Sequence, residues 1–315
     1  MANKKITELV QATSIVNTDL LLLETANGTR SIAYQDLKKP IDDAVTDAAK
    51  PHPFANNAAA HNGIFRGKDL TAIYTIDQIV AKIANGTFED LYIGDYFDVT
   101  ITTSYTANEK VRCILAGFDT YWNNGDTAFA RHHAVIVPKN CFNKTAAMNP
   151  TNTTDGGFVG SNMWTTILPV YKDALQSALG NHILMHRTLL TNTIGADLNS
   201  NAGAGFKGAS SNWAWTDTYL SLLSEIQVYG SNVFSSSFYD TGCDNLQLPL
   251  FALDPTAKVC EKNTTTDGNG DGGRQWYWLR NVASASSFAG VSLNGDSAYY
   301  GASGSYGVRP LFCIG

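Results

Sequence analysis

The last forty residues constrain the fold most strongly, because two stiff apolar stretches enclose a long segment that is almost free of charge. Residues 276–280 are Trp-Tyr-Trp-Leu-Arg, and residues 307–312 are Gly-Val-Arg-Pro-Leu-Phe. Between them Ser, Gly, Ala, Asn and Tyr predominate, and Asp296 is the one formal charge of residues 281–308. Tyr offers large, stiff contact area, while Ser, Gly and Asn offer adaptable hydrogen bonds. The segment therefore predicts a scaffold that displays a recognition surface.

This segment resembles the C-terminal C-type-lectin-fold domain of phage tail-tip and receptor-binding proteins. The family includes the variable proteins diversified by retroelements, such as the major tropism determinant. In that family a constant frame alternates with variable positions. This chain carries the frame as Trp278, Leu279, Arg280, Ser284, Phe288, Ala289, Val291, Gly295, Ala302, Ser303 and residues 307–310.

The resemblance extends upstream to residues 156–161, 184–187, 213–215 and 250–255, so it covers roughly residues 65–315. The alternative is a generic β-rich domain with a Gly/Ser-rich last hairpin. The resemblance implies that residues between the frame positions contact ligand. These candidate ligand-binding residues are Ser286, Ser287, Gly290, Ser292, Leu293, Asn294, Asp296, Tyr299, Tyr300, Gly301 and Tyr306.

The expected fold class is α+β: a C-type-lectin-like domain, shared with formylglycine-generating enzymes, preceded by a small β-hairpin and an Ala/Pro-containing linker. Asn27-Gly28 between two apolar stretches is a strong signal for a tight hairpin. We expect residues 1–40 to anchor the chain to a virion and residues 41–65 to form a linker that could be helical. Residues 66–315 would bind a receptor through the variable-type segment 281–307. An ordinary hairpin appendage is the alternative for residues 1–40.

Apolar periodicity predicts several elements of the larger domain. We expect one helix from Thr75 to about residue 85, another after Ser161 that ends at Gly180, and a third beginning near Asp217. Strands are expected at residues 91–93, 111–115 and 134–137.

Charge and cysteine content exclude several classes of function. The 22 Lys and Arg against 28 Asp and Glu give a net charge of −6, which offers no basic field for nucleic acid. Residues 1–8 lack the apolar core of a signal peptide, and the apolar run of residues 20–23 is too short to span a bilayer, so we expect neither a leader nor membrane insertion. Five widely spaced cysteines favour buried free thiols over a disulfide framework.

Two constellations could hold metal, and each has a simpler explanation. Asp267, Asn269 and Asp271 alternate as in a calcium loop, but the twelfth position is Trp278, so a Gly-rich turn explains them better. His182 and His186 have zinc-ligand spacing but lack a third ligand and the glutamate of a metalloprotease. We therefore expect no cofactor, and Arg280 and Arg309 to brace the scaffold through loop carbonyls.

These observations together predict a phage adhesin on the virion surface, made in the host cytoplasm. It would bind a host-cell surface receptor, protein or glycan, and attach to tail or capsid proteins through residues 1–40. The family resemblance favours a homotrimer. The alternatives are a structural fibre or capsid-decoration protein and a lectin-fold enzyme that uses Cys260 and Cys313, although no catalytic motif is present.

Overall fold

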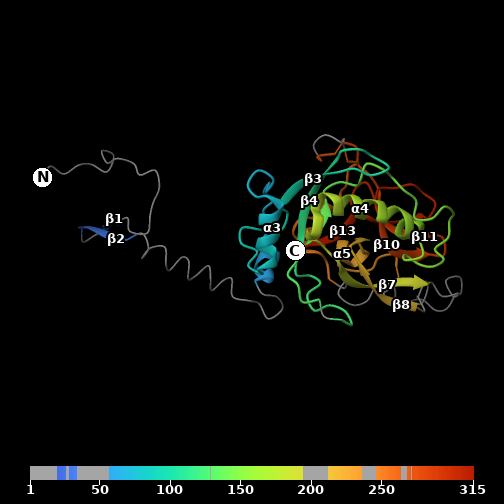
Figure 1. Cartoon of the computed structure of the whole chain (residues 1–315), viewed down its shortest axis with the longest axis horizontal. Helices are drawn as coiled ribbons and strands as arrows, with labels where there is room; N and C mark the ends of the chain where they lie inside the picture. Colours follow the sequence, from blue (N-terminus) through green and yellow to red (C-terminus); the bar gives the residue numbers. More distant parts are fainter. Residues whose placement is uncertain are drawn as a thin grey trace. The chain divides into compact units, whose positions relative to one another are not determined.

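The computed structural model describes residues 20–25, 28–33, 57–127, 129–193, 212–235, 246–263, 268–270 and 272–315 (Figure 1). The chain divides into two compact units, Met1–Lys50 and Pro51–Gly315. The larger unit combines helices with antiparallel sheets, so the chain is an α+β protein. No helix in these residues is both long enough and apolar enough to cross a bilayer.

The smaller unit contains a two-stranded antiparallel hairpin. Strand β1 (Leu20–Thr25) pairs with β2 (Gly28–Ala33), with Leu20 opposite Ala33 and Thr25 opposite Gly28. The hairpin expected around Asn27-Gly28 is therefore confirmed.

The main sheet of the larger unit is built around the C-terminal strand. Its order is β3 (Tyr96–Ile101), β4 (Glu109–Phe118), β5 (Ala134–Pro138), β13 (Pro310–Ile314) and β6 (Ile183–Leu184), and β9 (Leu220–Leu222) also pairs with β13. Every residue of β13 is buried, which suits its unbroken apolar sequence. The strands expected at 111–115 and 134–137 are confirmed. The segment 91–93 instead forms a single bridge to Phe65.

Two helices follow the predicted periodicity. Helix α3 (Ile76–Ala84) begins with a capping box between Thr75 and Gln78. Helix α4 (Leu168–Leu179) continues a π-helical turn, η2 (Met163–Ile167), and packs against β3, β6 and β9. Pro169, which has no backbone N–H to donate, lies where the π-helical turn passes into α4.

The helix expected to begin near Asp217 is wrong. Asp217 lies in β8 (Asn212–Thr218), which pairs with β7 (His186–Thr193), and β9 follows directly. The helix starts later, as α5 (Glu225–Tyr229), because Ser224 and Gln227 form a complete capping box. The alternation Trp213-Ala214-Trp215-Thr216 fits an extended strand better than a helical face.

The remaining elements are short helices and the strands of a separate three-stranded sheet. They are α2 (Ala58–Asn62), η3 (Gly180–His182), α6 (Pro249–Leu253), η6 (Pro255–Lys258), β10 (Tyr277–Ser284), β11 (Ser287–Val291) and β12 (Ser297–Gly301).

The expectation that all cysteines are free thiols is wrong for one pair. Cys141 and Cys260 form a disulfide across 119 residues of sequence, with Cα atoms 6.2 Å apart. Backbone pairing brings them together, since Cys141 N donates to Glu261 O at 2.9 Å and Asn263 N donates to Cys141 O at 2.9 Å. Cys113 and Cys313 are free and buried. Cys260 therefore does not pair with Cys313.

Candidate functional site

The candidate site is built on the three-stranded antiparallel sheet β10–β11–β12. The central strand β11 is buried along its whole length, whereas β12 is the partly exposed edge. Phe288 faces Tyr300 across the two strands, and Ala289 faces Tyr299. A buried strand thus supports an edge strand that reaches solvent.

The turn between β11 and β12 is held by its own side chains. Ser292 N donates to Asp296 O at 2.8 Å, and Ser292 Oγ accepts from the backbone N–H groups of Asn294 and Asp296, both at 3.2 Å. Arg274 Nη1 donates to Asn294 Oδ1 at 2.7 Å. Gly295 adopts a positive φ of 85°, a conformation that L side chains rarely take. The turn therefore presents Leu293, Asn294 and Asp296 on a fixed backbone.

Four aromatic residues join the edge strand to the frame. The Tyr300 ring centroid lies 4.4 Å from that of Tyr306 and 5.6 Å from that of Trp276, which stacks on it. Trp278 meets Tyr300 and Tyr306 edge-on and is buried, with its Nε1 donating to Ala146 O at 2.8 Å. Burial raises the pKa of Tyr300 from its ordinary value of 10 to about 12. The cluster runs from the buried core to solvent, because Trp276 is 38% exposed.

The structure brings nine of the eleven candidate residues to an accessible position. Five are exposed: Ser286, Leu293, Asn294, Asp296 and Tyr299. Four are half-buried: Ser292, Tyr300, Gly301 and Tyr306. We call these nine residues the recognition surface. Ser287 and Gly290 are buried in β11, so they lie beneath this surface.

A second segment borders the recognition surface and was not foreseen from the sequence. Phe234 is 41% exposed, and its ring lies 5.0 Å from that of Tyr299, which is 56% exposed. The buried Glu225 carboxylate holds this segment, accepting backbone N–H groups from residues 233–235 and the hydroxyl of Ser297 on β12 at 3.2 Å. One carboxylate therefore ties the two segments together. In the sequence, the capping-box residues that begin at Ser224 were the one feature that could have indicated an ordered segment next to the recognition surface.

Both framing arginines, which were expected to brace the scaffold through loop carbonyls, are buried. Arg309 donates from Nε to Pro138 O and from Nη1 to Ala257 O, both at 2.8 Å, which confirms its bracing role. The Arg280 backbone N donates to Leu223 O at 2.9 Å, and its side chain reaches the Thr188 hydroxyl at 3.5 Å. Both arginines lie beneath the surface and hold neighbouring segments in place.

The structure describes only some of the metal candidates expected from the sequence. Asp267 and Asp271 lie outside those residues, and Asn269 Oδ1 accepts from Arg112 Nη1 at 2.6 Å. His182 Nε2 contacts Asp77 Oδ1 at 2.7 Å, whereas His186 is buried in β7. No group of three His, Cys, Asp or Glu suited to a metal ion occurs in the part of the chain that is described.

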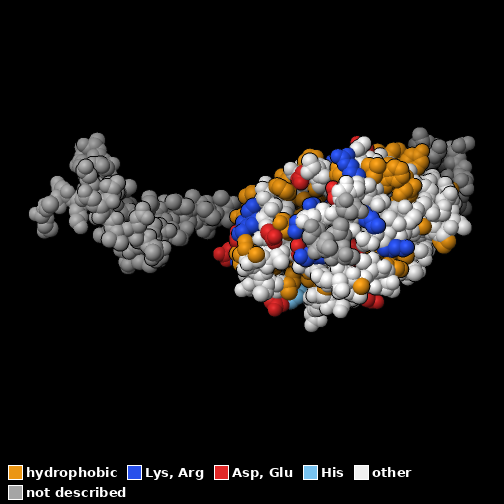
Figure 2. Space-filling model, turned by 90° about the horizontal axis from the view of Figure 1, so that it is seen from above, with side chains coloured by type: hydrophobic (Ala, Val, Ile, Leu, Met, Phe, Trp, Pro, Cys, Tyr) orange, Lys and Arg blue, Asp and Glu red, His pale blue; other side chains and the backbone are white. Residues whose placement is uncertain are grey.

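On the face drawn in Figure 2, Lys and Arg and Asp and Glu side chains are scattered singly and in small groups among uncharged and hydrophobic ones.

No protein-family model, curated protein or solved structure matches the chain.

Proposed function

We propose that this chain is a phage receptor-binding protein that attaches non-covalently to a host-cell surface ligand through the recognition surface. The observation that carries the proposal is the contrast within residues 276–309. The frame positions Trp278, Phe288 and Val291 are fully buried, while the intervening Leu293, Asp296 and Tyr299 are exposed. Such a division lets exposed residues change without loss of the fold, as a diversified lectin-fold domain requires.

The composition of the surface favours binding over catalysis. Tyr299 supplies a large exposed ring, Phe234 extends its apolar area, and Ser286, Asn294 and Asp296 supply hydrogen-bonding groups at its margins. Rigid aromatic anchors beside small polar groups are typical of recognition surfaces. The ligand would be a protein or glycan of the bacterial surface.

The proposal extends to the particle. Residues 1–40 would attach the protein to tail or capsid proteins, and assembly as a homotrimer would place several weak sites on one particle. Linked sites gain avidity through effective concentration. The protein would then act on the virion surface. We also propose that the larger unit is a C-type-lectin-like domain.

The test measures binding of the fluorescently labelled full chain to a panel of bacterial strains. The surface variant carries Leu293→Ser, Asp296→Ala and Tyr299→Ser. The matched control carries Ile73→Ser and Met185→Ser, which remove apolar side chains that are 47% and 44% exposed outside the recognition surface. We expect the surface variant to lose binding to the strains that the parent binds, while the control retains it.

Two outcomes would count against the proposal. Equal binding by the surface variant and the parent would show that the recognition surface does not bind the host-cell ligand. Absence of binding by the parent, together with incorporation into particles, would favour the structural decoration protein.

A further inference from the structure

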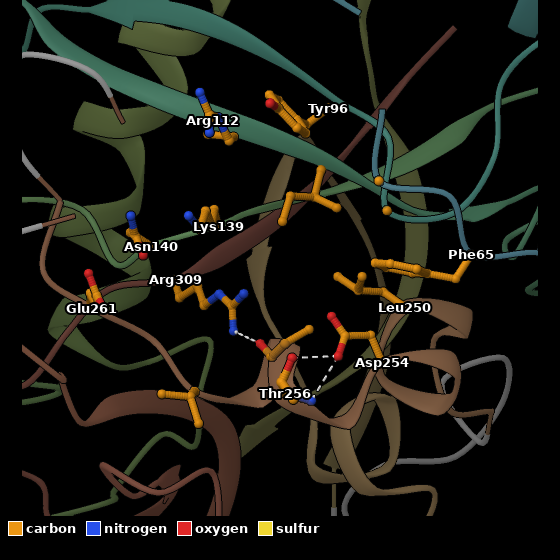
Figure 3. Close-up of a pocket in the computed structure, with 15 residues that line it drawn as sticks. Phe65, Tyr96, Arg112, Lys139, Asn140, Leu250, Asp254, Thr256, Glu261 and Arg309 are labelled. Carbon is orange, nitrogen blue, oxygen red and sulfur yellow. Dashed lines mark hydrogen bonds between the residues drawn. The ribbon is translucent and has the colours of Figure 1, made fainter. Parts of the chain in front are cut away.

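A cavity of about 330 Å³ lies in the larger unit, separate from the recognition surface (Figure 3). Strands β3 and β4, the end of β5 and residues 250–261 contribute to its lining, and none of the nine surface residues does. Its volume is at the lower end of the range for small-molecule sites, roughly 300–1,000 Å³. The cavity therefore suits a ligand about the size of one sugar ring.

Three cations line one side of this cavity, and hydrogen bonds hold them together. The Lys139 backbone N donates to Arg112 O at 2.8 Å, and the Arg309 side chain donates from Nε to the carbonyl of Pro138, the residue before Lys139, at 2.8 Å. Figure 3 shows Arg112, Lys139 and Arg309 along the same side.

These cations differ in how far their charge is compensated. Arg112 is paired with Asp98 at 2.9 Å and lies over the Tyr96 ring. Arg309 is 1% exposed and donates to two carbonyls and the Tyr277 hydroxyl, but its Nη2 donates to no described residue. The Lys139 ammonium, likewise, has no hydrogen-bond or ion-pair partner within the described ranges.

Neither carboxylate of the lining forms an ion pair with Lys139 or Arg309 in the described residues. Asp254 accepts from the backbone N and the hydroxyl of Thr256, at 3.0 and 2.5 Å. Glu261 accepts from Gly272 N at 3.2 Å. The buried Arg309 guanidinium and the half-buried Lys139 therefore keep hydrogen-bond donors that an anionic ligand in the cavity can use.

The opposite side of the cavity carries the apolar side chains of Phe65 and Leu250, with the Asp254 carboxylate beside Leu250 (Figure 3). Phe65 is 45% exposed, yet its ring lies on Gly94, where a Cβ atom would approach Phe65 Cε2 to 2.3 Å. Gly94 has a φ of 85°, so other residues are disfavoured there on two grounds. Leu250 is buried beside this ring (Figure 3). An aromatic face held in this way can stack on the apolar face of a ring.

We propose that this cavity binds a carboxylated sugar ring of the uronic acid class. The carboxylate would accept hydrogen bonds from Lys139 Nζ and Arg309 Nη2, and the C–H face of the ring would lie on Phe65. The cavity shares no residue with the recognition surface. This proposal therefore does not depend on whether that surface binds a receptor.

The test is isothermal titration calorimetry, which measures the affinity of the full chain for D-glucuronate. D-Glucose and benzoate serve as comparison ligands. We expect glucuronate to bind with a Kd of order 1 mM, which is about what two solvent-accessible charge-assisted contacts with ring stacking support for so small a ligand. Glucose should bind at least about tenfold more weakly, because it lacks the charge. A polysaccharide that ends in glucuronate is titrated as well. Comparing its affinity with that of free glucuronate shows whether the cavity takes the end of a surface polysaccharide or the free sugar.

Variants assign the binding to the cavity. Lys139→Met keeps the length of the side chain and should weaken glucuronate binding by about tenfold. Lys144→Met removes an exposed lysine outside the cavity and should leave it unchanged. Tyr299→Ser on the recognition surface should also leave it unchanged, which separates this site from the proposed receptor contact.

Several results would overturn the assignment. Equal affinity for glucuronate and glucose would exclude the carboxylate contact. Unchanged glucuronate binding by a folded Lys139→Met variant would exclude the cavity. Tighter binding of benzoate than of glucuronate would replace the sugar with an aromatic acid, and no detectable glucuronate binding at about 20 mM would reject the site.

Discussion

Tyr300 on β12 lies against Gly290 on β11, and its ring occupies the space that a side chain at position 290 would need. A Cβ atom at 290 would lie 2.6 Å from Tyr300 Cε2 and 2.8 Å from the carbonyl oxygen of Tyr277. The missing side chain is therefore what allows Tyr300 to pack inward onto Trp278 while its strand remains at the surface.

Replacing Gly290 with Val should destabilise the protein, because Tyr300 can move but the Tyr277 carbonyl cannot. Overpacking of this kind costs about 1–3 kcal/mol in the free energy of unfolding, measured by thermal or denaturant unfolding. The control is Gly63→Ala, where the added Cβ would meet only ordinary contacts at 3.6 and 3.7 Å. Equal stability of Gly290→Val and the parent would contradict the packing described here.

The Cys141–Cys260 disulfide should leave three of the five cysteines as thiols. Titration of the purified, denatured protein before reduction should find three thiols per chain, and peptide mapping should recover the linked pair. Replacing both cysteines with Ser should lower the free energy of unfolding by about 2–4 kcal/mol, because the bond closes a loop of more than a hundred residues. Five titratable thiols in the purified protein would contradict the pairing.

His133 should make the protein less stable in mild acid. It is buried, its Nε2 accepts from Tyr121 N at 3.0 Å, and its Nδ1 lies 2.9 Å from Arg131 O, so the neutral ring satisfies both contacts. Burial lowers the pKa of His133 below its ordinary value of 6.5. The unfolded chain then binds the proton more readily, and stability is lost as the pH falls from 6.5 through the folded-state pKa.

Imidazole NMR titration and urea unfolding over this pH range check the His133 prediction. His61 contributes in the same direction, since burial also lowers its pKa. Asp119 lies nearby and accepts from His133 N at 2.9 Å. A His133 ring that titrates at or above 6.5, or unfolding energies that are flat between pH 7 and 5, would disprove it.

Much of the fold was accessible from the sequence where one local signal dominated. The capping residue Thr75 and the apolar period after it predicted α3, and the apolar patterns of residues 111–115 and 134–137 predicted strands within β4 and β5. No helix begins at Asp217. Asp is a common N-cap residue, but the alternation of residues 213–216 before it favours the strand that forms there. Ser224 carried the complete capping box instead.

Long-range pairing was not accessible from one sequence. Cys141 and Cys260 are 119 residues apart, and only backbone pairing in the fold brings them together. Glu225 looks like an ordinary first-turn acid, yet its buried carboxylate holds residues 233–235. The cavity beside Lys139 draws on residues 65–309, so no local pattern marks it.

The most direct measurement is a substitution scan of residues 276–309 that records unfolding temperature and cell binding for each folded variant. The account predicts that changes at Ser286, Leu293, Asn294, Asp296 and Tyr299 alter binding while stability stays within about 0.5 kcal/mol of the parent. Changes at Trp278 and Phe288 should cost about 3–5 kcal/mol. Folded variants that bind as the parent does at all five exposed positions would contradict the central claim.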